Sequence, residues 1–377
     1  MTRALIAARV ITPRECHAPG VLLIEDGRIT AVGRRDAIEI PRQAQIRDCG
    51  GATLAPGFID LHVHGGGGRD FMQAARERDR GGLEEIRRHL ARHGVTTALA
   101  TTMTAPWEQT LAAMHELARA GWDIHAEGPF LSRRQPGVHP PELLLEPTRE
   151  RLDQMWDSSQ GRLRWITLAP ELPGASEFIA AAVARGIGVA LGHSDATLEQ
   201  ARAGIAAGAR HATHVFNAMR PLHHREPGLL AEVLGNLNLS AEIIADGIHV
   251  DPVVVNLFLR LKGENLAVLV SDGISAAGCG DGEFLLGELQ VEVKNGRCLL
   301  GDKLAGSVLT LDAAVQNIVR WSGWPIEKAV QLATLNPANA LGLKQKGRLE
   351  IGADADLVEL SPQGGVMATY VAGQQVN

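Results

Sequence analysis

Histidine and carboxylate side chains end several apolar, β-branched runs in this sequence. His62 and His64 form a His-x-His pair, and Glu127, His193 and His214 end later runs. Because side chains alternate along a strand, His62 and His64 face the same side of theirs. Neutral imidazole and carboxylate are suitable ligands for Zn²⁺ and comparable divalent ions. Together these residues predict a metal site, and three protein ligands leave coordination positions open for water.

A further carboxylate, Asp272, ends an apolar run in the segment LVSDGISAAG. A carboxylate beside an activated water accepts its proton and later delivers that proton to a leaving group. The alternative is that Asp272 only caps the turn before Gly273. The position at a strand end favours the acid/base interpretation.

Strands alternating with helices would bring these residues together. The predicted helices are amphipathic, for example 83–93, 107–120 and 176–186. Eight predicted strands followed by such segments are typical of a (β/α)8 TIM barrel, whose active site lies at the carboxyl ends of the strands. Further polar residues stand there: Glu171, Asp246 and His249. The predicted strands are 53–63, 95–101, 122–128, 164–171, 187–193, 210–216, 239–246 and 266–272.

The two ends of the chain differ from the middle. Residues 21–33 have the pattern of a hairpin joined at Asp26-Gly27, a dipeptide that tolerates a type I′ turn. Segments 347–360 and 365–376 again have the pattern of strands. We therefore expect a small β-sandwich domain built from residues 1–52 and 344–377, beside a catalytic barrel over 53–343.

The composition is that of an ordinary globular chain. The 377 residues are 45% apolar and 21% charged, which excludes disorder and coiled coil. A net charge of −6 argues against nucleic-acid binding. No apolar run approaches the length of about 18 residues that a membrane span needs. The four cysteines are scattered and the N-terminus lacks the pattern of a secretion signal, so we expect a cytoplasmic protein.

Seven motifs together resemble one enzyme family. PGFIDLHVHGGGG, HAEGPFL, GHSDAT, THVFNAMRPL, REPGL, DGIHVD and VSDGISAAG are similar to those of N-acetylglucosamine-6-phosphate deacetylases of the amidohydrolase superfamily. The resemblance runs from about residue 20 to 360 and keeps the order of the motifs. Many superfamily members use a carbamylated Lys to bridge two metals, but this chain has no Lys before Lys262. The deacetylase branch uses a Glu instead, which Glu127 matches.

The resemblance implies a reaction and its catalytic groups. Metal-dependent hydrolysis would remove the N-acetyl group of N-acetylglucosamine 6-phosphate, giving glucosamine 6-phosphate and acetate. Glu127, His193 and His214 match the main metal ligands. His62 and His64 match a second-metal pair that some members have lost, so one or two divalent ions are expected per subunit. Zn²⁺ is the expected ion, with Fe²⁺, Mn²⁺ and Co²⁺ as alternatives. Asp272 matches the acid/base, and His139 matches a histidine that polarises the substrate carbonyl.

The resemblance also implies the contacts to the sugar phosphate. Arg225 and His249 match residues that hold the phosphate, part of which a neighbouring subunit is expected to supply in a homodimer. No nucleic acid or membrane partner is expected. The full predicted substrate-binding set is Val138, His139, Asn217, Ala218, Arg225, Asp246, His249, Leu304, Ala305 and Gly306.

Three alternatives remain open at this point. The substrate could be the galacto epimer, N-acetylgalactosamine 6-phosphate, because sequence does not determine the geometry of the loops around one hydroxyl. Another amidohydrolase, such as an N-acyl-amino-acid hydrolase, is disfavoured by Arg225 and His249. A non-catalytic scaffold is disfavoured because the metal ligands and Asp272 are all retained.

Overall fold

The computed structural model of the chain describes residues 2–377, which pack as two compact units. The terminal unit comprises the residues up to Asp60, Arg88–Thr97 and Leu311–Asn377. The barrel unit comprises Leu61–Arg87 and Ala98–Thr310. The predicted domain boundaries, after residue 52 and after residue 343, stay a prediction.

A parallel sheet of eight strands forms the centre of the barrel unit within residues 2–377. Its strands follow one another in chain order, as the alternation of strand and helix predicted. A parallel bridge between Val63 and Gly273 joins the first strand to the segment after the last, so the barrel is nearly closed. The predicted (β/α)8 fold is confirmed. The strands are β8 (Phe58–Val63), β11 (Val95–Thr102), β12 (Asp123–Glu127), β13 (Leu163–Leu168), β14 (Gly188–Leu191), β15 (His211–Ala212), β16 (Ser240–Ile244) and β17 (Ala267–Val270).

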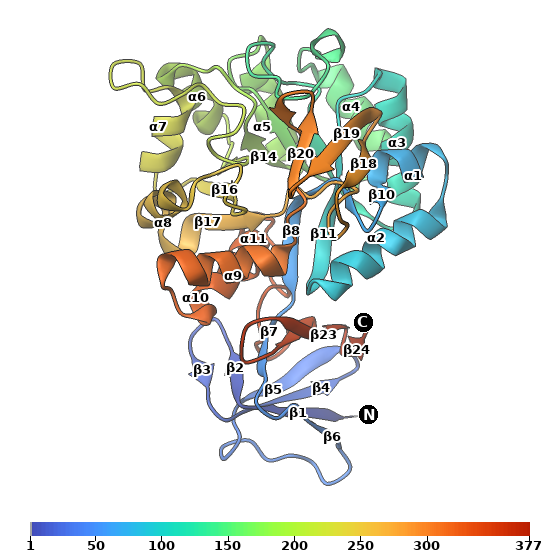
Figure 1. Cartoon of the computed structure of the whole chain (residues 1–377), viewed down its shortest axis with the longest axis vertical. Helices are drawn as coiled ribbons and strands as arrows, with labels where there is room; N and C mark the ends of the chain where they lie inside the picture. The colour runs from blue at the N-terminus through green and yellow to red at the C-terminus, as the bar shows by residue number, and fades with distance from the viewer. Residues whose placement is uncertain (1) are drawn as a thin grey trace. The chain divides into compact units, whose positions relative to one another are not determined.

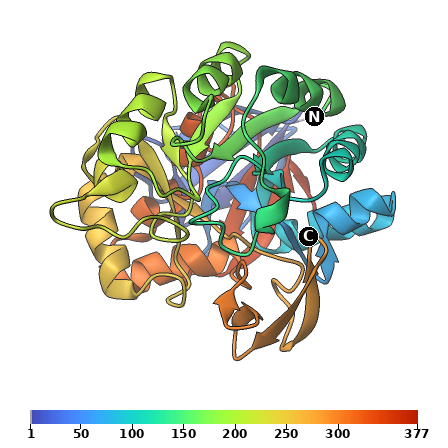
Figure 2. The same cartoon turned by 90° about the horizontal axis from the view of Figure 1, so that it is seen from above.

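Helices surround these strands in a ring (Figure 2). Their buried residues are mainly apolar, for example Leu117 in α3 and Phe178 in α5. At the start of α6, Thr197 and Gln200 form a capping box, which satisfies amide groups that the first turn leaves without partners. The helices are α1 (Phe71–Arg76), α2 (Arg80–Arg92), α3 (Trp107–Arg119), α4 (Arg149–Ser158), α5 (Ala175–Ala184), α6 (Leu198–Ala206), α7 (Gly228–Gly235) and α8 (Pro252–Leu266), with a 3-10 turn at Pro141–Leu143.

Three of the barrel strands end before the functional residue that the sequence predicted at their carboxyl end. β14, β15 and β17 end two residues before His193, His214 and Asp272, respectively. These three residues have φ values of 47°, 23° and 47°, in the left-handed region that non-glycine residues rarely adopt. The backbone therefore leaves the sheet just before each functional residue, which the apolar pattern of the run does not reveal.

A small antiparallel sheet follows the barrel strands in the chain and was not predicted. It consists of β18 (Gly282–Leu286), β19 (Leu289–Lys294), β20 (Arg297–Leu300) and β21 (Lys303–Leu304). Its inward side chains Val291, Val293 and Cys298 pack in one apolar cluster with Met103 and Ile274 of the barrel unit. Figure 1 shows β18, β19 and β20 side by side.

The terminal unit contains two sheets, one of which combines strands from both ends of the chain, and this confirms the predicted small β domain. One sheet has the order β5-β4-β1-β6 and the other β24-β23-β22-β7-β2-β3. Asp26 and Gly27 have φ values of 47° and 75°, the turn expected for the first hairpin. Leu54, Leu357 and Tyr370 are buried in one apolar cluster to which both ends of the chain contribute side chains.

The strands of this unit are β1 (Arg3–Ala7), β2 (Arg9–Ile11), β3 (Cys16–His17), β4 (Gly20–Glu25), β5 (Arg28–Arg34), β6 (Gln45–Asp48), β7 (Thr53–Pro56), β22 (Leu357–Leu360), β23 (Val366–Val371) and β24 (Gln374–Gln375). Its helices are α9 (Leu311–Ser322), α10 (Ile326–Gln331) and α11 (Leu335–Ala340).

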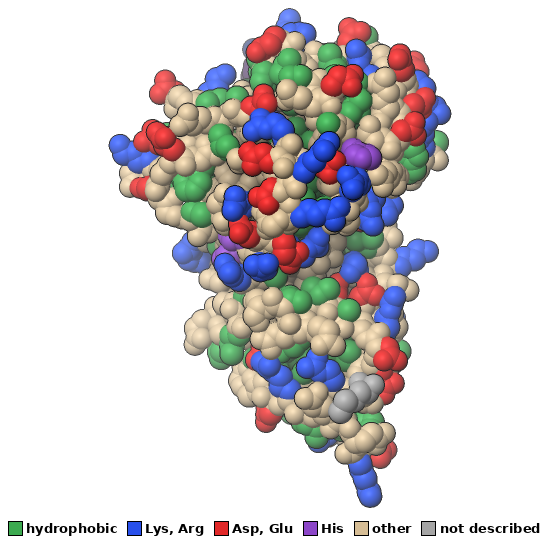
Figure 3. All heavy atoms as spheres, turned by 90° about the vertical axis from the view of Figure 1, so that its right-hand side faces the viewer, with side chains coloured by type: hydrophobic (Ala, Val, Ile, Leu, Met, Phe, Trp, Pro, Cys, Tyr) green, Lys and Arg blue, Asp and Glu red, His purple; other side chains and the backbone are tan. Residues whose placement is uncertain are grey.

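Charge and hydropathy of the folded chain agree with the composition. On the face shown in Figure 3, acidic and basic side chains lie interspersed. None of the helices formed by residues 2–377 combines the length and hydropathy needed to cross a bilayer.

Candidate metal centre

The predicted metal ligands converge at the carboxyl ends of the barrel strands. His62 is the last residue but one of β8, and His64 directly follows that strand. Glu127 is the last residue of β12. His193 and His214 follow β14 and β15. All five side chains are buried. The structure therefore brings together residues that are up to 152 positions apart in the chain, counting from His62 to His214.

Glu127 lies at the centre of this group. Its Oε1 is 3.1 Å from His193 Nε2, 3.0 Å from His214 Nε2 and 3.3 Å from His62 Nε2. Its Oε2 is 3.2 Å from His64 Nε2. Oε1 thus faces His193, His214 and His62, and Oε2 faces His64, so one carboxylate contacts members of both predicted ligand sets.

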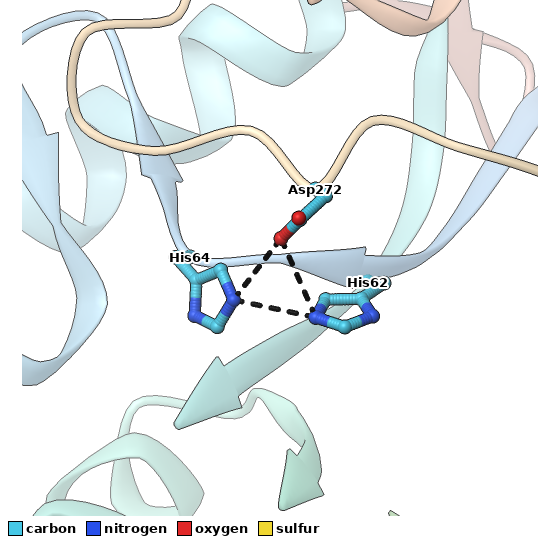
Figure 4. Close-up of side chains that lie close together, drawn as sticks. All are labelled: His62, His64 and Asp272. Atoms are coloured by element: carbon cyan, nitrogen blue, oxygen red, sulfur yellow. Dashed lines mark hydrogen bonds and ion pairs between the residues drawn. The ribbon is translucent and has the colours of Figure 1, made fainter. Parts of the chain in front are cut away.

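His62, His64 and Asp272 form a second, overlapping group (Figure 4). Asp272 Oδ1 lies 3.3 Å from His64 Nε2 and 3.5 Å from His62 Nε2, and the two imidazole nitrogens are 3.3 Å apart. Figure 4 shows the two rings projecting from one strand toward a carboxylate on the loop after β17. The predicted acid/base therefore sits beside the predicted second metal pair.

The spacing of these atoms fits a divalent cation. Zn²⁺ binds imidazole nitrogen at about 2.0–2.1 Å, which places the ligand atoms of a tetrahedral site about 3.3 Å apart. The observed separations are 3.0–3.5 Å. His193 Nε2 and His214 Nε2 face each other at 3.0 Å, close to the separation of two ligand atoms on one ion.

Hydrogen bonds on the far side of two rings leave the correct nitrogen free for a metal. His193 Nδ1 lies 3.2 Å from the carbonyl of Gln135, which only accepts, so Nδ1 carries the proton. His62 Nδ1 lies 3.3 Å from the Glu242 carboxylate and donates in the same way. In both residues Nε2 faces the site, and in His62 a bound cation would take the place of the proton that the neighbouring carboxylates favour there.

Charge within the site is balanced among these groups. Burial opposes the charged form of His62, but the Glu127 and Asp272 carboxylates outweigh it and hold the pKa of His62 well above its usual value. The same competition raises the pKa of His64 to about 9. Burial lowers the pKa of His193 to about 4, which leaves it neutral, as a metal ligand must be. The two carboxylates need positive charge nearby, and a divalent cation supplies it.

The pKa values of the two carboxyl groups are shifted in the same sense. Burial alone would raise the pKa of Glu127, but His62 and hydrogen bonds from the surrounding histidines hold it well below its usual range. Burial likewise opposes ionisation of Asp272, and His62 and His64 outweigh it and lower the pKa. Both groups are therefore carboxylates at neutral pH, which suits a ligand and a proton acceptor.

His139 stands beside the metal group with a defined tautomer. The backbone N–H of Thr104 donates to His139 Nδ1 at 3.4 Å, and the Thr104 hydroxyl lies 2.8 Å from the same atom. Because a backbone amide only donates, Nδ1 is unprotonated and Nε2 carries the proton. His139 Nε2 is 3.4 Å from Glu127 Oε2, so this donor faces the site.

A cavity of about 230 Å³ opens above the ligands. Gly306 has φ 62°, and a Cβ there would lie 2.4 Å from a methyl group of Ile274, so only glycine fits this turn. The cavity is lined by most of the predicted substrate-binding residues, namely Val138, His139, Asn217, Ala218, His249, Leu304 and Gly306.

Three predicted substrate-binding residues do not line this cavity. Ala305 is fully buried in the apolar cluster beneath the small sheet. Asp246 accepts hydrogen bonds from the backbone N–H and Nδ1 of His249, both within 2.8 Å, and so orients that ring. Arg225 is exposed on the loop before α7, where its guanidinium contacts His224. Of the two predicted phosphate-binding residues, His249 lines the cavity and Arg225 does not.

Asp246 also shifts the pKa of His249. Burial opposes protonation of this imidazole, but the hydrogen bond from its ring to Asp246 outweighs burial and raises the pKa of His249. A cation on the wall of the cavity suits an anionic group on a ligand.

Sequence reasoning missed one residue that supports the site and left another without a role. Glu242, in the middle of β16, accepts hydrogen bonds from His62 and His211. Glu171, expected at a strand end without an assigned partner, accepts from the Ser194 hydroxyl and the Asp195 amide in the loop after His193. A charged residue inside the apolar run LSAEIIAD was the available signal for Glu242.

Comparison with known proteins agrees with this geometry. An amidohydrolase family model matches residues 53–376. The N-acetylglucosamine-6-phosphate deacetylase of Vibrio furnissii is 37% identical over 382 residues, covering 98% of this chain and 94% of that protein. The N-acetylgalactosamine-6-phosphate deacetylase of Escherichia coli O157:H7 is 37% identical over 386 residues, covering 99% of both.

A solved structure extends the likeness to the whole fold. It is a variant of the N-acetyl-D-glucosamine-6-phosphate deacetylase of Mycobacterium smegmatis in complex with N-acetyl-D-glucosamine-6-phosphate. It matches this chain with a TM-score of 0.93 and 38% identity, covering 100% of this chain and 99% of that one. The family match and relatives that span almost the whole chain show that this protein belongs to the amidohydrolase family, as its motifs predicted.

Proposed function

We propose that this protein hydrolyses the N-acetyl group of N-acetylglucosamine 6-phosphate, releasing acetate and glucosamine 6-phosphate. The observation that carries the proposal is the buried group of histidines and carboxylates beneath a cavity that His249 also lines. Relatives that span 98% of the chain bear the name of this activity.

One or two divalent ions per subunit would be held by this group. Glu127, His193 and His214 would hold the first, and His62 and His64 would hold the second. Histidine and carboxylate ligands suit Zn²⁺, the expected ion, and they suit Fe²⁺, Mn²⁺ and Co²⁺ as well. When bound, such an ion lowers the pKa of water from about 15.7 toward 7 and polarises a carbonyl.

Asp272 would move the proton in this reaction. Its carboxylate is ionised and faces the metal ligands, so it accepts a proton from the attacking water. It then delivers that proton to the amide nitrogen, because an amine leaves only when protonated. Water attacks directly and no acyl-enzyme forms.

His139 would stabilise the charge that develops on the substrate carbonyl. Thr104 holds its proton on Nε2, which faces the site. A fixed donor aimed at a developing oxyanion needs no reorganisation during the reaction.

His249 and Arg225 would recognise the phosphate. His249 lies in the cavity wall, while Arg225 is exposed, is not among the lining residues and contacts His224. This separation supports a homodimer in which Arg225 reaches the phosphate in the neighbouring subunit. The free state of all four cysteines supports a cytoplasmic location.

N-Acetylgalactosamine 6-phosphate is the second candidate substrate, because a relative covering 99% of the chain bears that name. Acetate release should be compared on N-acetylglucosamine 6-phosphate, N-acetylgalactosamine 6-phosphate and unphosphorylated N-acetylglucosamine. A clear preference for the first supports the proposal. A preference for the second would reassign the epimer, and equal rates with and without phosphate would refute phosphate recognition.

A further inference from the structure

A buried carboxylate beneath the metal ligands has no part in the reaction described above. Glu242 lies in β16, and its side chain is completely buried. A buried carboxylate is costly unless it is hydrogen-bonded. Both carboxylate oxygens of Glu242 have hydrogen-bond partners. His211 Nε2 lies 3.1 Å from Oε1, and the backbone N–H of His214 donates to Oε2 at 3.1 Å. Its remaining contact is His62 Nδ1, 3.3 Å from Oε2.

The contact with His62 determines which nitrogen of that ring is available. A carboxylate accepts, so His62 keeps a proton on Nδ1 and presents Nε2 to Glu127 and Asp272, where a bound cation would take the place of a second proton. The other ligands lack a carboxylate there: His193 Nδ1 faces the backbone carbonyl of Gln135, and within residues 2–377 the Nδ1 atoms of His64 and His214 have no hydrogen-bond partner. His62 is thus the ligand whose ring is held by a buried carboxylate.

The contact with His214 begins where strand pairing ends. β15 and β16 pair only at His211 with Ser240 and at Ala212 with Ala241. Beyond that point two hydrogen bonds to Glu242 take the place of the regular hydrogen bonds between the strands. Its side chain accepts from the His214 amide, and its backbone carbonyl accepts from the Val215 amide at 2.9 Å. It thereby holds a backbone that turns to φ 23° at His214.

We propose that Glu242 is a positioning residue that joins the two halves of the metal centre. It fixes the ring of His62, which belongs to the second-metal pair, and the backbone of His214, which belongs to the main ligand set. Carboxylates that accept from ligating histidines raise metal affinity, and their loss weakens it about 10- to 100-fold. The inference rests on the metal-binding part of the proposed function and is independent of the substrate.

Cobalt binding tests this role without relying on activity. Metal-free wild type, Glu242→Gln and Glu242→Ala are titrated with Co²⁺, following the visible absorption of the bound ion and the bound metal per subunit. Gln keeps the size of the side chain but has a single acceptor oxygen, so it cannot serve three donors. We expect Co²⁺ affinity to fall about 10- to 100-fold in Glu242→Ala, less in Glu242→Gln, with an altered absorption spectrum in both.

Thr167→Val is the matched control. Thr167 is also a buried polar residue of a barrel strand, but it hydrogen-bonds His125 and Thr213 instead. It should lose thermal stability without losing Co²⁺ affinity. Wild-type affinity and spectrum in both Glu242 variants would overturn the proposal, whatever their thermal stability.

A measurement on the wild type covers the case in which the variants do not fold. In Zn²⁺-loaded protein labelled with ¹⁵N-histidine, the His62 signal should show a retained, hydrogen-bonded Nδ1–H and coordination through Nε2. Coordination through Nδ1 would overturn the proposal. Failure of the wild type itself to bind Co²⁺ or Zn²⁺ would instead refute the metal-binding part of the proposed function.

Discussion

The substitution Asp272→Asn removes the proton-transfer group of the proposed mechanism while keeping the size and shape of the side chain. Asp272 has φ 47°, a conformation that Asn tolerates and that strains Ala, so Asn is the substitution least disruptive to the backbone. Its amide oxygen still accepts where Oδ1 now faces His64 at 3.3 Å. What Asn cannot do is take a proton from water and pass it to the leaving nitrogen.

The loss should therefore appear in turnover. Removal of a general acid/base costs about 10²- to 10⁴-fold, or about 2.7–5.4 kcal/mol of transition-state stabilisation. We expect kcat for acetate release to fall by at least about 10²-fold, with KM nearly unchanged and metal content at the wild-type level. Turnover within about threefold of wild type at equal metal content would refute the role of Asp272. Loss of metal in step with turnover would show that Asp272 acts chiefly as a ligand.

Asp246→Asn is the contrasting variant, because Asp246 is a second aspartate of the same barrel face that holds His249. It should change KM for the phosphorylated sugar more than kcat. Equal effects of the two substitutions on kcat and KM would mean that neither residue has the specific role assigned to it.

The remaining predictions concern the second metal pair and the phosphate. His62→Ala should leave a partly active enzyme with reduced metal content, measured by elemental analysis; complete inactivity with no bound metal would place His62 in the essential site. Arg225→Ala should raise KM for the phosphorylated sugar far more than for the unphosphorylated one, and equal increases would exclude a phosphate contact. Because Asp246 raises the pKa of His249, the cation persists to higher pH than in an ordinary histidine. In Asp246→Asn, KM for the phosphorylated sugar should therefore begin to rise at lower pH than in wild type; identical pH profiles of KM would contradict this.

Much of the barrel could be predicted because its strands are buried on both faces. Such strands appear as continuous apolar, β-branched runs, and amphipathic segments separate them. The small sheet from β18 to β21 was missed, although Asn295-Gly296 between two alternating runs is a strong hairpin signal. Its strands are half exposed and carry charges, so they lack the apolar runs that mark the barrel strands.

The site could be predicted as a set of residue types but not as a geometry. Strand-end positions identified His62, Glu127 and Asp272, because parallel strands bring their carboxyl ends together. The left-handed backbone at His193 and His214 could not be foreseen, since it depends on tertiary contacts that hold a strained conformation. Those contacts, like the one from Glu242 to the His214 amide, join residues that are remote in sequence.

Acetate release from N-acetylglucosamine 6-phosphate by enzyme of known metal content tests the central claim most directly. The rate is measured on the purified protein, after removal of metal by a chelator, and after Zn²⁺ is restored. We predict that chelation lowers the rate by at least about 10²-fold and that Zn²⁺ restores it. An unchanged rate in metal-free protein would contradict a metal-dependent deacetylase, and so would no release from fully loaded protein.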